Sequence, residues 1–575
     1  MGIPSYFSYI VKNYPKIIKR FDNKNVSQSQ SLSIDNLYLD SNSIIYDAYY
    51  KMNQETLTEA VSQHIINKVI EKIEEYIDVI QPSKTVIIAF DGVAPVAKLE
   101  QQRNRRYKSW YQNEINKSIF GNKKPDVWNT ASITPGTKFM DDLNKKVALH
   151  FTKANTNTNT NTNTNTNTNT NTNTNPIQII VSGSNECGEG EHKIYDYIRN
   201  HKEKHSTETT IIYGLDADLI MLSINHLPVC PNLYLFRETP HFIQSIDNSL
   251  DPNAFYLIDI PMFSSSIVSY MNSQDNKNNT NNNNNNNNTI QINNINNKLY
   301  DYIFMCFMLG NDFMPHFPAI NIRTGGIDKL LNAYKETIKM DQSILTENGT
   351  KINWNLFAKF IRVLANLEED YIIVEHKKRS ATERRGLAET SPEEKFAKFE
   401  NLPLYDRDLE SYINPFKPYW QTRYYKALFN IHNENAKDQI KYICINYLQG
   451  LEWTMKYYTT GCPDWRWKYN YNYPPLLSDL IKYVPVFDTE FVTNKAPSPV
   501  SELVQLCYVL PRSSLNLLPE NLYYALIQQH NSWYKSDCDF IWAYCKYFWE
   551  SHVDLSEIDI QELQKVVGRF QGIKK

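Results

Sequence analysis

Five short apolar runs in the first 320 residues are each followed closely by acidic side chains. The runs lie at residues 37–39, 86–90, 177–181, 210–213 and 303–309, and their length and composition are typical of buried strands. The acids that follow them are Asp40, Asp91, Glu189, Glu191, Asp216, Asp218 and Asp312. Because functional residues collect at the carboxyl ends of parallel strands, we expect these seven acids to line one crevice.

The connection between the first two runs supports a parallel sheet. Residues 55–80 repeat apolar positions at helical spacing, which predicts an amphipathic helix between the strands that end at Asp40 and Asp91. A strand, helix, strand crossover joins parallel neighbours. We therefore predict an α/β fold, with a mostly parallel central sheet flanked by helices, and a largely helical region after it. A length of 575 residues is enough for two or more packed units.

The acids themselves indicate a cation site. An acid in a turn is most often a helix cap or a turn residue, which is the simpler interpretation of any one of them. Seven carboxylates in one crevice would repel one another unless cations lay between them, and oxygen-rich sites of this kind suit Mg²⁺. Gly188 and Gly190 flank Glu189 and allow the tight backbone that such a turn needs.

A basic segment follows Asp91. If residues 98–124 form a helix, Lys98, Gln102, Arg105 and Arg106 fall on one face of it. Guanidinium groups bind phosphate oxygens in pairs, so this face suits a phosphate group. The alternative is an ordinary solvated helix surface, which is the commoner fate of charged helical residues.

Aromatic residues alternate near residue 470. If the stretch is extended, one face of it carries Trp465, Trp467, Tyr469, Tyr471 and Tyr473. Alternating aromatics most often pack in a core. Stacking on nucleic-acid bases is the other interpretation.

Eight motifs together resemble a known signature. They lie at residues 1–4, 36–40, 91–95, 101–106, 133–137, 188–192, 214–219 and 310–313. In order and length they resemble the motifs of the Xrn-type processive 5′-to-3′ exoribonucleases, with weaker similarity as far as about residue 515. The Asn-rich composition would suit an AT-rich genome such as that of a protist or large virus.

The resemblance implies a function for each group of residues. The fold would be a 5′ nuclease or PIN-like core, and the reaction would hydrolyse 5′-monophosphorylated single-stranded RNA to nucleoside 5′-monophosphates in RNA decay. Two Mg²⁺ ions, for which Mn²⁺ can substitute, would be held by the seven acids and act by the two-metal scheme. The 5′-phosphate would lie on Lys98, Gln102, Arg105 and Arg106. Decapping or RNA-processing factors would be partners.

The sequence departs from the family pattern in three places. Tyr46 stands where the family has a His that stacks on the first base, and either Trp465 or Trp467 would be the second stacking ring. Cys187 replaces a Pro before Gly188, which the turn should tolerate. The sequence ends soon after the second conserved region, so we expect the long C-terminal extensions of large cytoplasmic members to be missing and processivity to be reduced.

We predict a nuclease catalytic domain at residues 1–340 and a helical second conserved region at 341–575 that packs on it. Low-complexity tracts rich in Asn interrupt the first domain as disordered inserts at about residues 153–176 and 272–298. The eight cysteines form no CxxC pair, and the sequence has no secretory signal and no apolar run long enough to span a bilayer. These features predict an intracellular protein that does not bind a membrane. The basic triplet at residues 377–379 is too short for a nuclear signal, so the cytoplasm is expected.

Two other functions fit parts of the sequence. A structure-specific 5′ DNA nuclease, such as a flap endonuclease, shares the carboxylate-ringed core but usually follows its last acids with a Gly-rich helix-hairpin-helix, and residues 313–318 do not resemble one. A non-catalytic RNA-binding scaffold would be favoured by loss of a key acid. None of the seven is lost.

Overall fold

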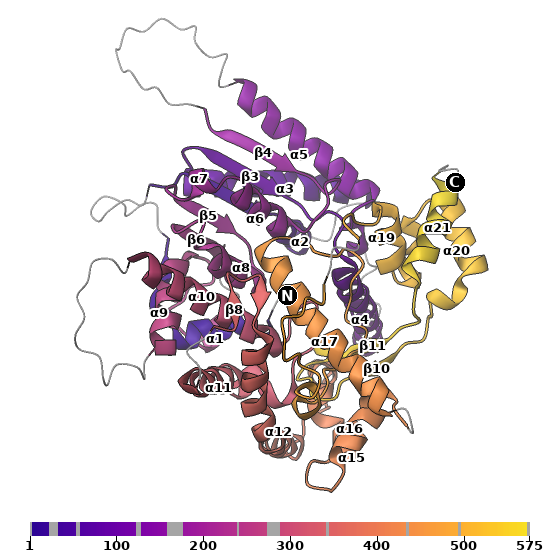
Figure 1. The fold of residues 1–575 in the computed structure, drawn as a ribbon. Helices are drawn as coiled ribbons and strands as arrows, with labels where there is room; N and C mark the ends of the chain where they lie inside the picture. The colour runs from indigo at the N-terminus through magenta and orange to yellow at the C-terminus, as the bar shows by residue number, and fades with distance from the viewer. Residues whose placement is uncertain are drawn as a thin grey trace, which may run out of the picture.

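The computed structural model describes residues 3–21, 33–52, 58–121, 128–157, 176–238, 241–272, 288–340, 344–432, 436–492 and 496–571 (Figure 1). Met1 and Gly2 of the first motif lie outside the described residues, as do residues 158–175 and 273–287 in the predicted inserts.

A sheet of seven strands forms the centre of the first half of the chain. In spatial order its strands are β1 (Ile18–Arg20), β7 (Phe255–Asp259), β6 (Leu233–Glu238), β5 (Thr210–Tyr213), β2 (Asn36–Asp40), β3 (Thr85–Ala89) and β4 (Gln178–Ser182). The five strands from β6 to β4 are parallel, and β7 and β1 are antiparallel to their neighbours. The predicted mostly parallel sheet is therefore confirmed.

Helices cover both faces of this sheet because its strands are apolar on both sides. Leu37 and Leu39 of β2 face one hydrophobic cluster, and Tyr38 between them faces the other. The first cluster includes α2 (Asn42–Tyr50), α3 (Thr58–Ile80) and α5 (Lys138–Asn157). The second includes α1 (Tyr6–Asn13), α6 (Gly190–Asn200), α8 (Asp218–His226), α9 (Ile260–Asn272) and α10 (Asn288–Cys306). Helix α3 is the predicted crossover, and α7 (Lys202–His205) is a short turn after α6.

Two local predictions are wrong. The apolar run at 303–309 is no strand, since it forms the end of α10 and a short 3-10 turn. Helix α5 continues to Asn157 and α10 starts at Asn288, and the inserts between core elements stay a prediction. Residues 465–473 form a loop in which Tyr469 donates a hydrogen bond to the carbonyl of Tyr473 at 2.8 Å, so the aromatics do not share one face of a strand.

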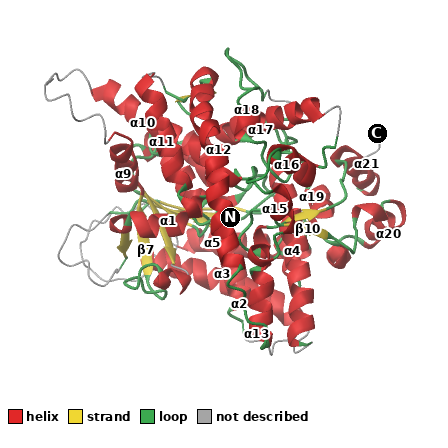
Figure 2. Cartoon of the chain, turned by 90° about the horizontal axis from the view of Figure 1, so that it is seen from below, coloured by secondary structure: helices red, strands yellow, loops and turns green. Residues whose placement is uncertain are grey.

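The second half is largely helical, as predicted (Figure 2). Its helices are α11 (Gly326–Met340), α12 (Trp354–Glu383), α13 (Pro392–Glu400), α14 (Leu402–Tyr405), α15 (Asp408–Ile413), α16 (Trp420–Phe429), α17 (Ala436–Thr459), α18 (Leu477–Leu480), α19 (Glu502–Val509), α20 (Glu520–Gln529) and α21 (Ile560–Phe570). Two small antiparallel pairs join β8 (Thr346–Glu347) to β9 (Lys351–Ile352) and β10 (Asp539–Ile541) to β11 (His552–Asp554). The boundary at residue 340 stays a prediction.

The two halves share their hydrophobic cores. Buried residues of α8 and α10 belong to the same cluster as those of α12 and α17. A third cluster joins the segment before and at the start of α4 (Val96–Phe120) to α19 and α21 (Figure 1). The long helix α4 is thus packed between the sheet region and the C-terminal helices. Among the residues that the structure describes, no helix combines the length and hydropathy needed to cross a bilayer.

Candidate active site

The carboxyl ends of neighbouring strands bring the predicted acids together. Asp40 is the last residue of β2, and Asp91 follows β3 by two residues. Glu189 and Glu191 lie at the start of α6, after β4, and Asp216 and Asp218 lie between β5 and the first turn of α8. Asp312 comes from the turn after α10 rather than from a strand. Five of the seven side chains are buried, while Asp91 is half-buried and Asp216 is exposed.

Two overlapping groups of these side chains could each hold a metal ion. Ligand atoms of Asp40, Asp91 and Glu191 lie within 4.8 Å of one another, and so do those of Glu189, Glu191 and His192. Glu191 belongs to both groups. The arrangement therefore offers adjoining cation positions with one shared carboxylate.

The backbone of the α6 turn allows this close approach. The Gly190 amide donates a hydrogen bond to Asp91 Oδ1 at 2.7 Å, and a Cβ at Gly190 would lie only 2.5 Å from Asp40 Oδ1. Asn42 fixes Asp91 from the other side, because its Nδ2 donates to Asp91 Oδ2 at 2.6 Å and its Oδ1 accepts the Asp91 amide at 3.0 Å. Any side chain at Gly190 would push the acids apart.

The electrostatics of the cluster fit a cation site. Burial and the neighbouring carboxylates raise the pKa values of Asp40 and Glu191 well above their ordinary range. Burial and the Asp312 charge raise the pKa of Asp218 to about 7. Among the described residues, Asp40 Oδ1 and Asp218 Oδ1 are buried without hydrogen-bond partners. Divalent cations would both satisfy these oxygens and remove the repulsion, so the residues fit Mg²⁺.

Lys98 lies among the carboxylates. Its ammonium contacts Asp312 Oδ2 at 2.7 Å and also pairs with Glu189 Oε2. Although burial opposes the charge, Asp312 and Glu189 raise the pKa of Lys98 well above its ordinary value. The side chain that the sequence places in the phosphate pocket therefore bridges two of the predicted metal ligands in this structure.

The other predicted phosphate-binding residues lie one and two turns further along α4. Burial lowers the pKa of Arg106 to about 10, and its Nη1 is buried without a hydrogen-bond partner in the described part of the chain. Gln102 Oε1 is likewise buried without a hydrogen-bond partner among the described residues. A groove of about 850 Å³, here called the outer groove, is lined by Tyr46, Arg105, Arg106, Trp110 and Trp128 among others. The structure therefore brings Tyr46 and both arginines together.

The two candidate tryptophans differ in their surroundings. Trp467 stacks on Trp453 with ring centres 5.0 Å apart, so one face of its indole is covered. Trp465 is half-buried, and its backbone pairs with Ala496 and with Val96 at the start of α4. This link places Trp465 next to the basic helix.

Sequence reasoning missed three residues of the site. The Tyr457 hydroxyl, from α17, donates a hydrogen bond to Glu189 Oε1 at 2.8 Å. The buried His192 ring lies 3.8 Å from the Tyr457 ring. Asn42 could have been predicted, because its amide side chain lies only two residues after Asp40. Tyr457 could not, because it lies 268 residues from Glu189 and no local pattern connects the two.

The chain is similar to known proteins along most of its length. Residues 1–239 match the family described as "XRN 5′-3′ exonuclease N-terminus", and residues 292–407 and 390–571 match the one described as "Xrn1 helical domain". A 5′-3′ exoribonuclease 1 of Saccharomyces cerevisiae is 27% identical over 90% of the chain, which covers 40% of that protein. A 5′-3′ exoribonuclease 2 homolog of Drosophila melanogaster is 27% identical over 90% of the chain, covering 65% of that protein.

The human protein named 5′-3′ exoribonuclease 1 is also 27% identical over 90% of the chain, with 31% of its own length covered. The chain thus spans less than two thirds of the length of these relatives.

Proposed function

Because this chain belongs to the XRN 5′-3′ exonuclease family, we propose that it hydrolyses 5′-monophosphorylated single-stranded RNA from the 5′ end and releases nucleoside 5′-monophosphates. The observation that carries the proposal is the buried acid cluster beside α4, where Asp40 Oδ1, Asp218 Oδ1 and Arg106 Nη1 find no hydrogen-bond partner among the residues that the structure describes. A metal-dependent exonuclease that selects a phosphorylated end needs both features, one for cations and one for the terminal phosphate.

The seven acids would hold two Mg²⁺ ions, with Mn²⁺ as a substitute. When bound, such ions lower the pKa of water and stabilise the charge that develops on the phosphate and the leaving oxygen. Asn42 and the Gly190 amide orient Asp91, and Tyr457 orients Glu189. Lys98 neutralises Asp312 on one side of the cluster.

The basic residues would select the substrate. Lys98, Gln102, Arg105 and Arg106 would bind the terminal phosphate, which fixes one nucleotide between that phosphate and the acids. Arg106 lines the outer groove, where its guanidinium would contact a single terminal phosphate. Tyr46 and Trp465 would stack on the first base, and we favour Trp465 over Trp467 because Trp453 covers one face of Trp467.

The test is release of labelled nucleotide from matched RNAs with a 5′-monophosphate, 5′-triphosphate or 5′-hydroxyl, in Mg²⁺, Mn²⁺ or EDTA. We expect mononucleotide only from the monophosphate RNA, only with metal, and none from the Glu191→Gln variant. Glu186→Gln is the matched control, since Glu186 lies at the same turn but is exposed and bonds Ser182. Cleavage by Glu191→Gln at the parent rate would contradict the proposal.

A flap DNA included beside these RNAs tests the second function. Cleavage of the flap and of no RNA would indicate a DNA nuclease, and cleavage of neither would indicate a binding scaffold. The role in RNA decay, the decapping or processing partners and the cytoplasmic location stay predictions.

A further inference from the structure

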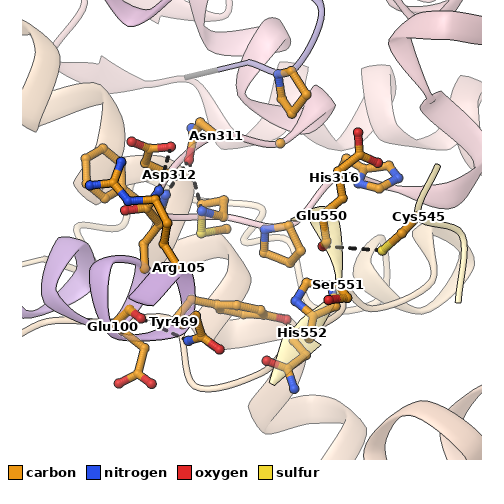
Figure 3. A pocket seen from close by; sticks show the side chains of 18 of the residues that line it. Glu100, Arg105, Asn311, Asp312, His316, Tyr469, Cys545, Glu550, Ser551 and His552 are labelled. Atoms are coloured by element: carbon orange, nitrogen blue, oxygen red, sulfur yellow. Dashed lines mark hydrogen bonds between the residues drawn. The ribbon is translucent and has the colours of Figure 1, made fainter. Parts of the chain in front are cut away.

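A second cavity adjoins the acid cluster, and apart from Arg105 and Asp312 the residues named below from its lining have no part in the function proposed so far. It measures about 230 Å³ and is here called the inner cavity, with Gln101, Arg105, Asn311, His316, Asn472 and Ser551 in its lining (Figure 3). This is just below the range of roughly 300–1,000 Å³ that is typical of sites for small ligands. It therefore suits one small molecule and not a polymer.

The lining of the inner cavity holds polar atoms that lack partners. Among the described residues, Gln101 Oε1, Asn311 Nδ2, His316 Nε2 and Ser551 Oγ are buried without hydrogen bonds. Buried polar groups are normally paired, so four in one cavity indicate a polar ligand.

Two of these side chains have fixed orientations. Asn311 Oδ1 accepts the amides of Phe313 and Met314, each at 2.9 Å, so its NH₂ group stays available as a donor. Gln101 Nε2 donates to Asp312 Oδ1 at 3.4 Å, so its Oε1 stays available as an acceptor. The cavity thus presents donors and acceptors together, as the edge of a nucleobase or a ribose requires.

The position of the inner cavity links it to the reaction. Asp312 and Arg105 both line it, and Arg105 also lines the outer groove. Figure 3 shows Arg105, Asn311 and Asp312 close together at one end of the cavity, with His316, Glu550 and Ser551 toward the other. Arg105 therefore stands between the two spaces, within reach of an anion in either.

From these observations we propose that the inner cavity is the binding site and exit route of the nucleoside 5′-monophosphate that each cut releases. The inference rests on the proposed exoribonuclease activity. During repeated cleavage the outer groove stays occupied by RNA, so the product needs a second space. In the inner cavity Arg105 keeps its contact with the phosphate, while Asn311, Gln101 and Ser551 bind the nucleoside.

Measurements of nucleotide binding can distinguish the inner cavity from the outer groove as the product site. The probes are adenosine and uridine 5′-monophosphate, with inorganic phosphate for comparison, titrated calorimetrically into the full chain in EDTA without RNA. Ser551→Ala removes one unpaired hydroxyl and should weaken nucleotide binding about 3- to 10-fold, the value of one hydrogen bond. Asn472→Trp should fill the cavity and weaken binding by more than about 10-fold. Tyr46→Ala removes a ring of the outer groove, so any affinity that it costs measures nucleotide bound there, and the losses from Ser551→Ala and Asn472→Trp should persist in that background.

The opposite pattern overturns the proposal. A loss of affinity in Tyr46→Ala alone would place the nucleotide in the outer groove, and no binding by the parent chain, or no change in any variant, would leave the inner cavity without this ligand. Neither result touches the proposed function, because RNA cleavage is measured separately. Absence of RNA cleavage together with nucleotide binding in the cavity would instead refute the nuclease.

The order of events gives a second measurement. In rapid-quench experiments on 5′-phosphorylated RNA, Asn472→Trp should release the first nucleotide at a rate within about 2-fold of the parent, and later nucleotides about 10-fold more slowly, since only product departure is obstructed. Equal slowing of the first and later nucleotides would show that the substitution affects cleavage, and would refute the exit route.

Discussion

Replacing Asp218 by Asn should stabilise the metal-free protein while it abolishes RNA cleavage. Burial and the Asp312 charge raise the pKa of Asp218 from an ordinary 3.8 to about 7. Between these two values the folded state holds a proton that the unfolded state has released, so stability falls as pH rises. Above pH 7 the ionised Asp218 side chain therefore lowers the free energy of unfolding by about 4 kcal/mol, since each tenfold difference in proton affinity between the folded and unfolded states corresponds to about 1.4 kcal/mol.

The asparagine variant removes this cost, and the gain should depend on pH. At pH 8 we expect up to about 4 kcal/mol of added stability, and at pH 5 only about 2 kcal/mol, because folded Asp218 is then protonated. Mg²⁺ should stabilise the parent chain more than the variant, since the ions relieve the same repulsion.

Asp312→Asn is the matched control, because the same substitution at Asp312 should lower the free energy of unfolding and not raise it. Burial disfavours the charge of Asp312, but the Lys98 ammonium outweighs it and holds the pKa of this carboxyl below its ordinary value. Removing one partner of a buried ion pair costs up to about 3–5 kcal/mol. Asp312→Asn should therefore destabilise the metal-free protein.

Urea unfolding of the full chain in EDTA, at pH 5 and pH 8, measures both effects. An equal gain from Asp218→Asn at both pH values, or midpoint shifts in the same direction for the two variants, would contradict this account of the two carboxyl groups. Added Mg²⁺ that stabilises Asp218→Asn as much as the parent chain would also refute it.

Three further predictions concern other parts of the site and the fold. Tyr457→Phe removes the hydrogen bond to Glu189 and should raise the Mg²⁺ concentration for half-maximal activity several-fold, with RNA affinity unchanged. Arg106→Met should raise KM for 5′-monophosphate RNA at least about 10-fold and leave binding of 5′-hydroxyl RNA unchanged, since one charged hydrogen-bond donor is lost. Glu410→Gln leaves the buried Arg379 without its charge partner and should lower unfolding stability by about 3–5 kcal/mol in urea titrations.

Each of the three has a contradicting result. For Tyr457→Phe it is an unchanged metal requirement, and for Arg106→Met it is an equal loss of affinity for both RNAs. For Glu410→Gln it is an unfolding midpoint equal to that of the parent chain.

Local pattern was enough to predict the strands that carry the acids. The runs before Asp40, Asp91 and Asp216 form β2, β3 and β5. In an α/β fold, a short apolar run between two helices usually forms a strand of the central sheet. The same pattern failed before Asp312, where the run is the buried end of α10. An apolar run that is buried on all sides does not distinguish a helix from a strand.

Contacts between segments that lie far apart in the sequence could not be predicted from local sequence patterns. Tyr457 contacts Glu189 only because α17 packs against α6, and no periodicity in either helix reveals that contact. Lys98 was predicted from its position on a helix face, but its bridge between Glu189 and Asp312 depends on how α4 lies against the sheet. Arg379, in the basic triplet at residues 377–379, is buried and pairs with Glu410 of a different helix, which no local pattern indicates.

The way in which α4 is packed has a consequence for synthesis of the protein on the ribosome. Val93, Ala94 and Leu99 share their core with residues 500–567, and the Ala94 amide bonds Gln505 Oε1 at 3.0 Å. The sheet and its acids are synthesised early, but the start of the basic helix gains these core partners only when residues 500–567 have been made. A nascent chain is therefore expected to complete the packing around α4 only after residues 500–567 have left the ribosome.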